Sequence, residues 1–429
     1  MSTKTTRRKF LKTAAVTAIG MPTIIPARAL GLDGNVAPSN RIVLGGIGLG
    51  PRGRKVLEGF YQHDDCQFVA IADPQKERRE IIKRLTDREY ENNDCVTYDD
   101  MSAVLERDDI DAVIIATGDR WHTTASILAA RAGKDIYCEK PCAMNIQECQ
   151  ELDDEVTKHQ RVFQAGTQRR NVGNFELARD LAKTGKLGNI TSVHAGILAL
   201  QDYLPPLPEE PEPDPAEINW DKWVGPAPMK PFNAEYCKGR WRNHAGFYAA
   251  WRLPEWGAHT IDLCQWAADA DGTAPVEYET IDDNTIHAKY DNGIKLVMRL
   301  SGFKDEGEWT KGLGSCPVKF EGDEGWVEAG DFEVLAVSDD KLLEGRDYEK
   351  MAGTDPVNHA RDFLNCVKTR EQPRCNSKVT RNGHLACFAA AISWKLGRKV
   401  TFNPETEDFG DDAEANAFRT YERRTPYTI

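Results

Sequence analysis

The chain has 429 residues, of which 40% are apolar and 9% aromatic, and its formal net charge is -13. This length exceeds what one hydrophobic core usually serves, so we expect a globular protein of two domains. The acidic balance, without any long basic run, argues against nucleic acid and anionic membrane surfaces as partners. No run of about 18 apolar residues occurs, so we expect no membrane-spanning helix once the N-terminal signal is removed.

The first 29 residues have the features of an export signal rather than of a folded segment. Arg7 and Arg8 precede Phe10 and Leu11, a mild apolar stretch follows, and residues 27–29 read Ala-Arg-Ala. This order predicts a twin-arginine signal peptide over residues 1–29 with a small-x-small cleavage site. A basic N-terminal arm is the alternative. Removal of the segment takes away six basic residues and no acid, so the mature charge becomes -13 - 6 = -19. We therefore expect a periplasmic or otherwise extracytoplasmic protein.

The cysteines and histidines show no metal-binding spacing. The eleven cysteines are an odd number without a Cys-x-x-Cys pair, and the nine histidines are scattered. We expect no metal site and expect most cysteines to be small core residues. A disulfide formed after export stays open.

Residues 40–165 alternate short apolar strands with helical patterns. This alternation is typical of a parallel sheet with crossover helices, so we predict a Rossmann domain there. We expect helices over 54–61, 125–132 and 146–159. The predicted strands are 41–46, 67–72, 112–116, 135–138 and 162–165.

Residues 166–429 have a different pattern. Alternating apolar residues flank Asn292-Gly293, which predicts a hairpin of residues 286–290 and 294–300. Residues 204–217 are almost wholly proline and acid, which predicts a surface loop. We expect helices over 359–369 and 380–396. The fold class is therefore α/β plus α+β: a Rossmann sheet, then a substrate and oligomerisation domain with a large open, mainly antiparallel sheet and C-terminal helices.

A glycine-rich turn follows the first predicted strand. Gly48, Gly50 and Gly53 have the Gly-x-Gly-x-x-Gly spacing, with Arg52 between them, and the second predicted strand ends at Asp73. Such a turn brings a helix N-terminus to a pyrophosphate, and the carboxylate accepts the ribose hydroxyls. A carboxylate also repels a 2′-phosphate, so NAD is expected rather than NADP. Lys76, Arg78 and Arg79 just behind could offset this repulsion.

A lysine follows the strand predicted over 135–138, within Glu139-Lys140-Pro141. With this motif the chain resembles the glucose–fructose oxidoreductase, inositol dehydrogenase and rhizopine-catabolism family (Gfo/Idh/MocA), most of all its exported branch. The resemblance covers nearly the whole chain after residue 40. The other segments that carry it are 116–122, 166–170, 256–262 and 322–326.

The resemblance implies roles for several residues. Lys140 would be the catalytic lysine beside the nicotinamide, and His259 would take the hydroxyl proton. Asp262, one helical turn on, could orient the imidazole or contact substrate. The family usually has aspartate four residues before the histidine; this chain has Glu255 there, which would be a third catalytic residue, as an acid that orients the imidazole or as a substrate contact. Hydride removal from a carbinol needs a base and a positive group, and His259 and Lys140 supply this pair.

Other residues are weaker candidates. Thr117, His122, Glu139 and Gln168 are expected to contact the cofactor, whereas Arg169 and Trp241 are candidates for substrate contact. All could instead be ordinary loop or core residues. A sugar platform and plain core packing are equally good interpretations of four tryptophans, which are Trp220, Trp223, Trp241 and Trp256.

These features together predict an NAD(H)-dependent oxidoreductase acting on a hydroxyl or carbonyl of a small sugar or polyol. The first alternative is a glycosidase that uses bound NAD without net redox, although relatives of that kind tend to lack the Glu-Lys-Pro motif. The second alternative is a non-catalytic binding protein with the same fold. Because open antiparallel sheets commonly mediate dimers or tetramers in this family, we expect a homo-oligomer.

Overall fold

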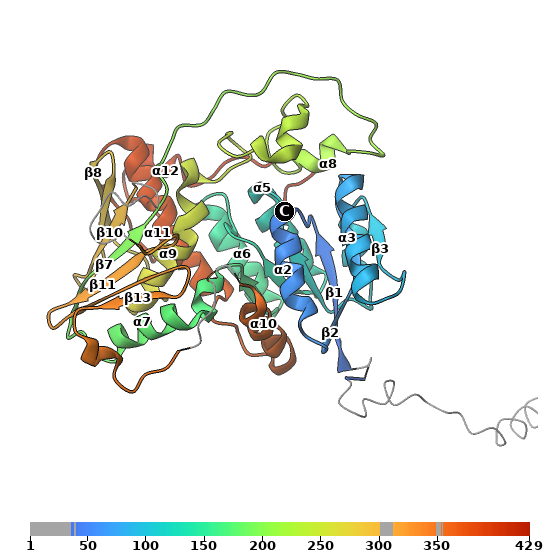
Figure 1. Ribbon diagram of the computed structural model, residues 1–429. Coiled ribbons are helices and arrows are strands. Elements are labelled where there is room, and N and C mark those ends of the chain that lie inside the picture. Colours follow the sequence, from blue (N-terminus) through green and yellow to red (C-terminus); the bar gives the residue numbers. More distant parts are fainter. Residues whose placement is uncertain (1–35, 38–39, 301–311, 349–352, 354) are drawn as a thin grey trace, which may run out of the picture. The chain divides into compact units, whose positions relative to one another are not determined.

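The computed structural model describes residues 36–37, 40–300, 312–348, 353 and 355–429. Residues 42–429 form one compact unit (Figure 1). The predicted signal peptide lies outside the described residues. Among those described, no helix is long and apolar enough to cross a membrane.

The first sheet has six parallel strands in the order β3-β2-β1-β4-β5-β6. This is the strand order of a dinucleotide-binding Rossmann sheet, with the switch point between β1 and β4. The five predicted strands are confirmed to within one residue at each end; only β3, a short strand, was not predicted. The strands are β1 (Ile42–Ile47), β2 (Cys66–Ala72), β3 (Val96–Tyr98), β4 (Ala112–Ile115), β5 (Asp135–Cys138) and β6 (Phe163–Ala165).

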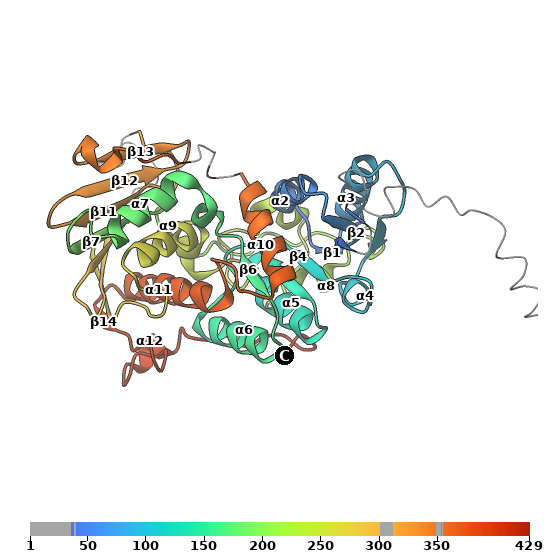
Figure 2. The same cartoon turned by 90° about the horizontal axis from the view of Figure 1, so that it is seen from below.

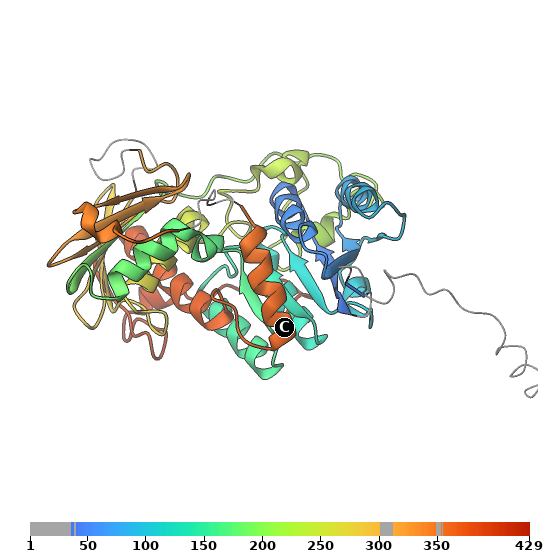
Figure 3. The ribbon, with the colours of Figure 1, turned by 60° about the horizontal axis from the view of Figure 1, so that its bottom comes forward.

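Helices cover both faces of this sheet. The prediction that the helix before β5 begins at residue 125 is wrong, since α5 begins at Asp119 and buries its polar first turns. The last helix of the set, α10, comes from late in the chain and packs beside α2, where Phe363 meets Phe60 (Figure 3). The helices are α2 (Pro51–Tyr61), α3 (Lys76–Glu89), α4 (Ser102–Leu105), α5 (Asp119–Arg131), α6 (Ile146–Lys158) and α10 (Val357–Thr369).

The second sheet has eight strands in the order β13-β12-β11-β7-β10-β9-β8-β14. Only the β7–β10 pair is parallel, so the predicted, mainly antiparallel sheet is confirmed. The predicted hairpin is present, with Gly293 at φ +91° in its turn. The strands are β7 (Ile190–Gly196), β8 (Glu277–Asp282), β9 (Thr285–Lys289), β10 (Lys295–Arg299), β11 (Val318–Gly322), β12 (Trp326–Gly330), β13 (Val334–Val337) and β14 (Val400–Thr401).

Three helices, α7 (Gly173–Lys183), α9 (Leu253–Ala267) and α11 (Ser377–Leu396), pack on one face of the second sheet (Figure 2). Leu296 and Met298 of β10 point into this core, and α9 is buried along almost its whole length. Short helical turns complete the fold, namely η3 (Gln168–Asn171), α8 (Trp220–Val224), η4 (Tyr236–Arg240), η5 (Ala250–Arg252), η6 (Asp340–Leu343) and α12 (Ala413–Asn416).

Residues 197–252 connect β7 to α9 by way of the first sheet, and we call them the cap segment. Its residues 204–217 are irregular and mostly exposed, as predicted. It then pairs with the chain just after β2: Lys76 N donates to the Glu217 carbonyl (2.9 Å) and Asn219 N donates to the Pro74 carbonyl (3.1 Å). The cap segment therefore lies beside the carboxyl ends of the first sheet's strands (Figure 1).

Candidate active site

The glycine-rich turn has a geometry that only glycine fits. Gly48 has φ +66°, and a Cβ there would lie 2.3 Å from Cγ2 of Thr117. A Cβ on Gly53 would lie 3.0 Å from that of Ala116, so this glycine lets α2 pack closely on the sheet. Gly50 is the residue before α2, whose N-terminal N–H groups and dipole favour a phosphate. The predicted phosphate-binding turn therefore has the required shape.

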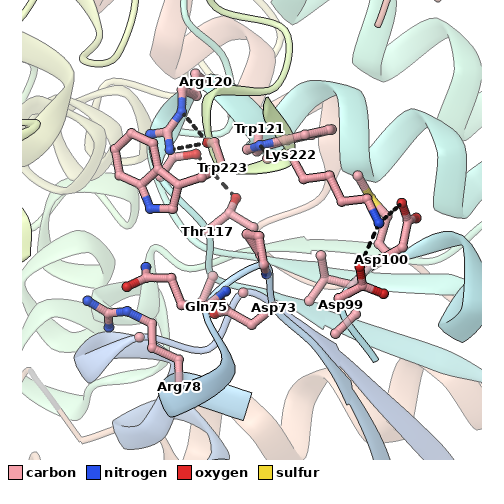
Figure 4. A pocket seen from close by; sticks show the side chains of 18 of the residues that line it. Asp73, Gln75, Arg78, Asp99, Asp100, Thr117, Arg120, Trp121, Lys222 and Trp223 are labelled. Atoms are coloured by element: carbon pink, nitrogen blue, oxygen red, sulfur yellow. Dashed lines mark hydrogen bonds and ion pairs between the residues drawn. The ribbon is translucent and has the colours of Figure 1, made fainter. Parts of the chain in front are cut away.

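A cavity of about 850 Å³ opens beside this turn (Figure 4). Its volume matches a ligand of dinucleotide size. The lining includes six residues predicted for cofactor or substrate, which are Gly48, Gly50, Arg52, Asp73, Thr117 and Trp241. Five others predicted to bind cofactor, Gly53, His122, Glu139, Lys140 and Gln168, do not line it.

Asp73 follows β2 and is only 5% exposed. Its Oδ1 accepts from Gln75 N (2.8 Å), and burial raises the pKa of its carboxyl to about 6. Arg79 donates to the Asp73 backbone carbonyl (3.0 Å), while Arg78 reaches across to the Cys237 carbonyl (2.7 Å). Both arginines lie near the carboxylate and favour its charged form, and Arg78 also lines the cavity.

The cap segment roofs the cavity. Lys222 of α8 forms ion pairs with Asp99 (2.9 Å) and Asp100 (3.0 Å), drawn as dashed lines in Figure 4. Its neighbour Trp223 lies under the guanidinium of Arg120, which also donates to the Trp223 carbonyl. These contacts tie the cap segment to the Rossmann domain on two sides of the cavity.

Lys140 follows β5 and is directed toward α9. Its Nζ donates to the backbone carbonyl of Glu255 and lies 5.5 Å from the ring of Trp256. Burial lowers the pKa of Lys140. His122 forms a hydrogen bond with the same segment, in which its Nδ1 lies 2.6 Å from the carbonyl oxygen of Pro141.

Glu139 lies under the glycine-rich turn and not in the cavity. Its Oε1 accepts from Arg52 Nε (3.0 Å), and a Cβ on Gly166 would lie 2.7 Å from this oxygen. Burial opposes ionisation, yet Arg52 and Lys140 hold the pKa of Glu139 below its usual value. The Glu139–Arg52 pair therefore joins the Glu-Lys-Pro segment to the first turn of α2.

His259 lies on α9, four residues after Glu255, and is 3% exposed. Its Nε2 is 3.0 Å from Nη1 of Arg169. Its Nδ1 is buried and has no hydrogen-bond partner among the described residues. Burial, and then the charges of Arg169 and Lys140, hold the pKa of His259 well below 6.5, so the imidazole is neutral.

Neither acid expected near His259 touches the imidazole. Asp262 pairs with Arg170 (2.6 Å) in the buried core between η3 and α9. Glu255 pairs with Arg252 (3.2 Å) and Arg242 (3.5 Å), and Tyr248 Oη also donates to it. The expectation that Asp262 orients the imidazole is therefore not met, because Arg170 holds its carboxylate elsewhere.

Arg169, and neither of these acids, is the residue that contacts the imidazole of His259. Asp331, in the turn between β12 and β13, accepts from its Nε (3.2 Å) and Nη2 (2.7 Å). Gln168 also contacts Arg169. In the side-chain amide orientation that gives both the oxygen and the nitrogen a partner, the oxygen of Gln168 accepts from Arg52 (2.9 Å) and from Arg169 (3.2 Å). Nothing in the sequence around Asp331 indicated this role, since the contact joins residues 162 positions apart.

The four tryptophans differ in what they contact. Trp220 and Trp223 stack on each other in the apolar core of the cap segment. Trp223 and Trp241 also line the cavity, whereas Trp220 and Trp256 do not. Trp256 lies 5.5 Å from Lys140 Nζ and 5.8 Å from the Arg169 guanidinium. Core packing therefore accounts for Trp220, while Trp223 both packs in the core and faces the cavity.

Among the described residues, no group of His, Cys, Asp or Glu is arranged to hold a metal ion. All eleven cysteines are buried, as expected of core residues.

Comparison with known proteins gives matches in both domains. Residues 41–167 match the family model described as an oxidoreductase family with NAD-binding Rossmann fold, and residues 206–315 and 343–429 match the model of its C-terminal alpha/beta domain. The solved structure of myo-inositol 2-dehydrogenase from Lactobacillus plantarum superposes with a TM-score of 0.60 at 17% identity, over 85% of this chain and all of that one.

Curated relatives match over shorter stretches. A glycosyl hydrolase family 109 protein from Solibacter usitatus is 31% identical over 159 residues, which is 35% of this chain and 36% of the relative. Myo-inositol 2-dehydrogenase from Thermotoga maritima is 27% identical over 163 residues, or 38% and 46%. The matches span less than half of each relative. Together with the fold and the two family models, these findings show that the chain belongs to the Gfo/Idh/MocA family of oxidoreductases.

Proposed function

We propose that this protein is an NAD(H)-dependent oxidoreductase that acts on a hydroxyl or carbonyl group of a small sugar or polyol. The observation that carries the proposal is the placement of Lys140 and His259. His259 is buried and Lys140 is partly buried, and both lie beside Trp256, Lys140 just after a Rossmann strand and His259 on a helix of the second domain. A substrate between them would meet a cation, a neutral imidazole and an aromatic face.

The two residues divide the work of the reaction. Bound NAD would supply the hydride acceptor. The neutral imidazole of His259 takes the hydroxyl proton as the C–H bond breaks, and Lys140 donates to the oxygen on which negative charge develops. In the reverse direction the proton held on His259 Nε2 would return to the carbonyl oxygen, while Lys140 would again donate a hydrogen bond to that oxygen.

The residues present fit NAD. The turn of Gly48 and Gly50 lets a pyrophosphate approach the N-terminus of α2, and Asp73 is free to accept from ribose hydroxyls. A 2′-phosphate would meet the Asp73 carboxylate at close range, which favours NAD over NADP. Arg78 and Arg79 lie near this carboxylate, and Arg78 lines the cavity, so they are the residues that would offset this repulsion.

A redox-neutral glycosidase is the second candidate, because one relative is named a glycosyl hydrolase family 109 protein. In such chemistry a sugar hydroxyl is oxidised, the aglycone leaves, water adds and the carbonyl is reduced again. Relatives of that kind tend to lack the Glu-Lys-Pro motif, and the intact Glu139-Lys140-Pro141 of this chain ranks this candidate second.

One experiment separates the two. Nucleotide released from the purified protein is identified by chromatography, and the nucleotide-loaded protein is then incubated with a panel of polyols and aryl glycosides. Net appearance of reduced nicotinamide supports the dehydrogenase. Release of aglycone without it would contradict the dehydrogenase and support the glycosidase.

We also propose that the chain is exported by the twin-arginine route, that residues 1–29 are removed, and that the mature protein is a homo-oligomer. Export of a folded protein suits an enzyme that carries its nucleotide with it. Support for the route comes from the order of residues 7–29.

A further inference from the structure

We propose that Arg169 is a positioning residue that holds His259 as a neutral base, with hydrogen on Nδ1 and the lone pair of Nε2 directed at the guanidinium. The assignment of a base rests on the proposed function, whereas the tautomer follows from the geometry alone.

The tautomer follows from what arginine can do. A guanidinium has five N–H donors and no acceptor, and it keeps its charge in proteins. At 3.0 Å from Arg169 Nη1, Nε2 of His259 must therefore be the acceptor. A neutral imidazole with an accepting Nε2 carries its hydrogen on Nδ1. This is the form in which Nε2 can take a proton.

Asp331 fixes Arg169 in this position. It binds Nε and Nη2 and leaves Nη1 as the edge of the guanidinium that faces the imidazole. Ser315 Oγ donates to the same carboxylate (2.5 Å). Side chains of Arg169 and Asp331 are 3% and 1% exposed, so solvent does not screen the pair. A bidentate pair of this kind gives orientation as well as charge.

Burial is the largest cause of the low pKa of His259, and the charge of Arg169 is the next. Arg169 is the nearest of several cations around His259, while the nearby acids are bound to other groups: Glu255 to two arginines and Asp262 to Arg170. The charged and titratable groups that face the imidazole are Arg169 of η3, Lys140 after β5, Arg52 of α2 and His359 of α10.

In the oxidation direction the reacting hydroxyl would replace the Arg169 donor at Nε2. Its O–H bond breaks and an N–H bond forms at Nε2, while the hydride of the same carbon goes to the nicotinamide and a carbonyl remains. Arg169, still held by Asp331, therefore acts through His259.

The test is ¹⁵N NMR of selectively labelled histidine in the full-length protein, with the His259 signal identified by its absence in His259→Gln. We expect wild type to show a bare Nε2 and a protonated Nδ1 across roughly pH 5 to 8. In Arg169→Gln with Asp331→Asn, which removes both charges together, the imidazole pKa should rise by roughly 1–3 pH units. Arg169→Lys, which keeps the charge, should leave the pKa low.

Arg179→Gln of α7 is the matched control and should leave the His259 signal unchanged. A wild-type His259 with hydrogen on Nε2 would overturn the proposal, even if the double variant does not fold. An unchanged pKa in a folded double variant would overturn it as well. Because the measurement needs no substrate, it stands whether or not the protein oxidises a sugar, so the two proposals fail separately.

Discussion

Nζ of Lys140 donates to the backbone carbonyl of Glu255, in the first turn of α9. This bond joins the end of a Rossmann strand to the helix that carries His259 four residues later. The backbone carbonyl accepts this hydrogen bond and the carboxylate does not. The bond therefore does not depend on which side chain residue 255 carries.

Glu255→Asp should therefore be tolerated. The backbone carbonyl remains, and the shorter side chain loses part of its pairing with Arg242 and Arg252, which are partly exposed and contribute little. We expect turnover within about tenfold of wild type, since a general base typically contributes about 10²–10⁴. A loss of 100-fold or more in steady-state assays would place the carboxylate in the chemistry instead.

Asp73→Ala should weaken NAD binding by about 1–3 kcal/mol, because a buried group loses its ribose contact. It should also reduce the preference for NAD over NADP, since the repulsion of a 2′-phosphate disappears. Calorimetric titration with both nucleotides measures both effects. Asp64→Ala, at an exposed position, is the control. Unchanged affinity and preference would show that Asp73 does not meet the ribose.

His384 predicts how stability depends on pH. Its Nε2 accepts from Cys142 N (3.0 Å), two residues after Lys140, and its Nδ1 donates to the Thr380 carbonyl (2.8 Å). Burial lowers its pKa to about 4. An unfolded histidine titrates near pH 6.5, so between about 6.5 and 4 the unfolded chain binds a proton that the native one does not. The contribution of His384 to the free energy of unfolding is therefore present above pH 6.5 and is lost on acidification. The loss is about 1.4 kcal/mol per pH unit and about 3 kcal/mol between pH 6.5 and pH 4.

His384→Gln keeps an acceptor for Cys142 but does not titrate. Denaturant unfolding between pH 7 and 4 should show a smaller loss of stability in this variant than in wild type. His159→Gln, at the exposed end of α6, should keep the wild-type slope. Equal slopes in all three proteins would mean that His384 is not buried in its neutral form.

The export proposal is tested by Arg7→Lys with Arg8→Lys. A twin-arginine signal needs the guanidinium pair, so folded protein should stay in the cytoplasm, whereas Arg28→Lys leaves the pair intact and should be exported. Cell fractionation with immunoblotting compares them. Normal arrival of the double variant outside the cytoplasm would refute the proposed route.

Much of the first domain could be predicted from sequence because its signals are local. Strands buried on both faces are short apolar runs, and the glycine spacing specifies its own turn. The start of α5 was missed since Asp119 to Thr124 are polar and buried only by distant segments, the cap segment among them. A helix whose burial depends on long-range packing does not show it in its own pattern.

The sequence singled out Lys140 and His259 as candidates but not the contacts around them. Both lie beside the ring of Trp256. The partner of the imidazole was not predictable: Asp262 has the right helical spacing, yet Arg170 holds it, and Arg169 with Asp331 takes that place. Spacing along a helix shows which residues share a face. It does not show which charged residues from other parts of the chain form ion pairs with them.

The central claim is that Lys140 and His259 carry the chemistry without holding the nucleotide. The most direct measurement is turnover in Lys140→Met and His259→Ala, taken beside NAD affinity, with Lys158→Met and His159→Ala of α6 as matched controls. We predict that His259→Ala loses about 10²–10⁴ in rate and that both site variants bind NAD nearly as wild type does. Near-normal turnover in both site variants, with NAD affinity unchanged, would contradict the account and move the active site elsewhere.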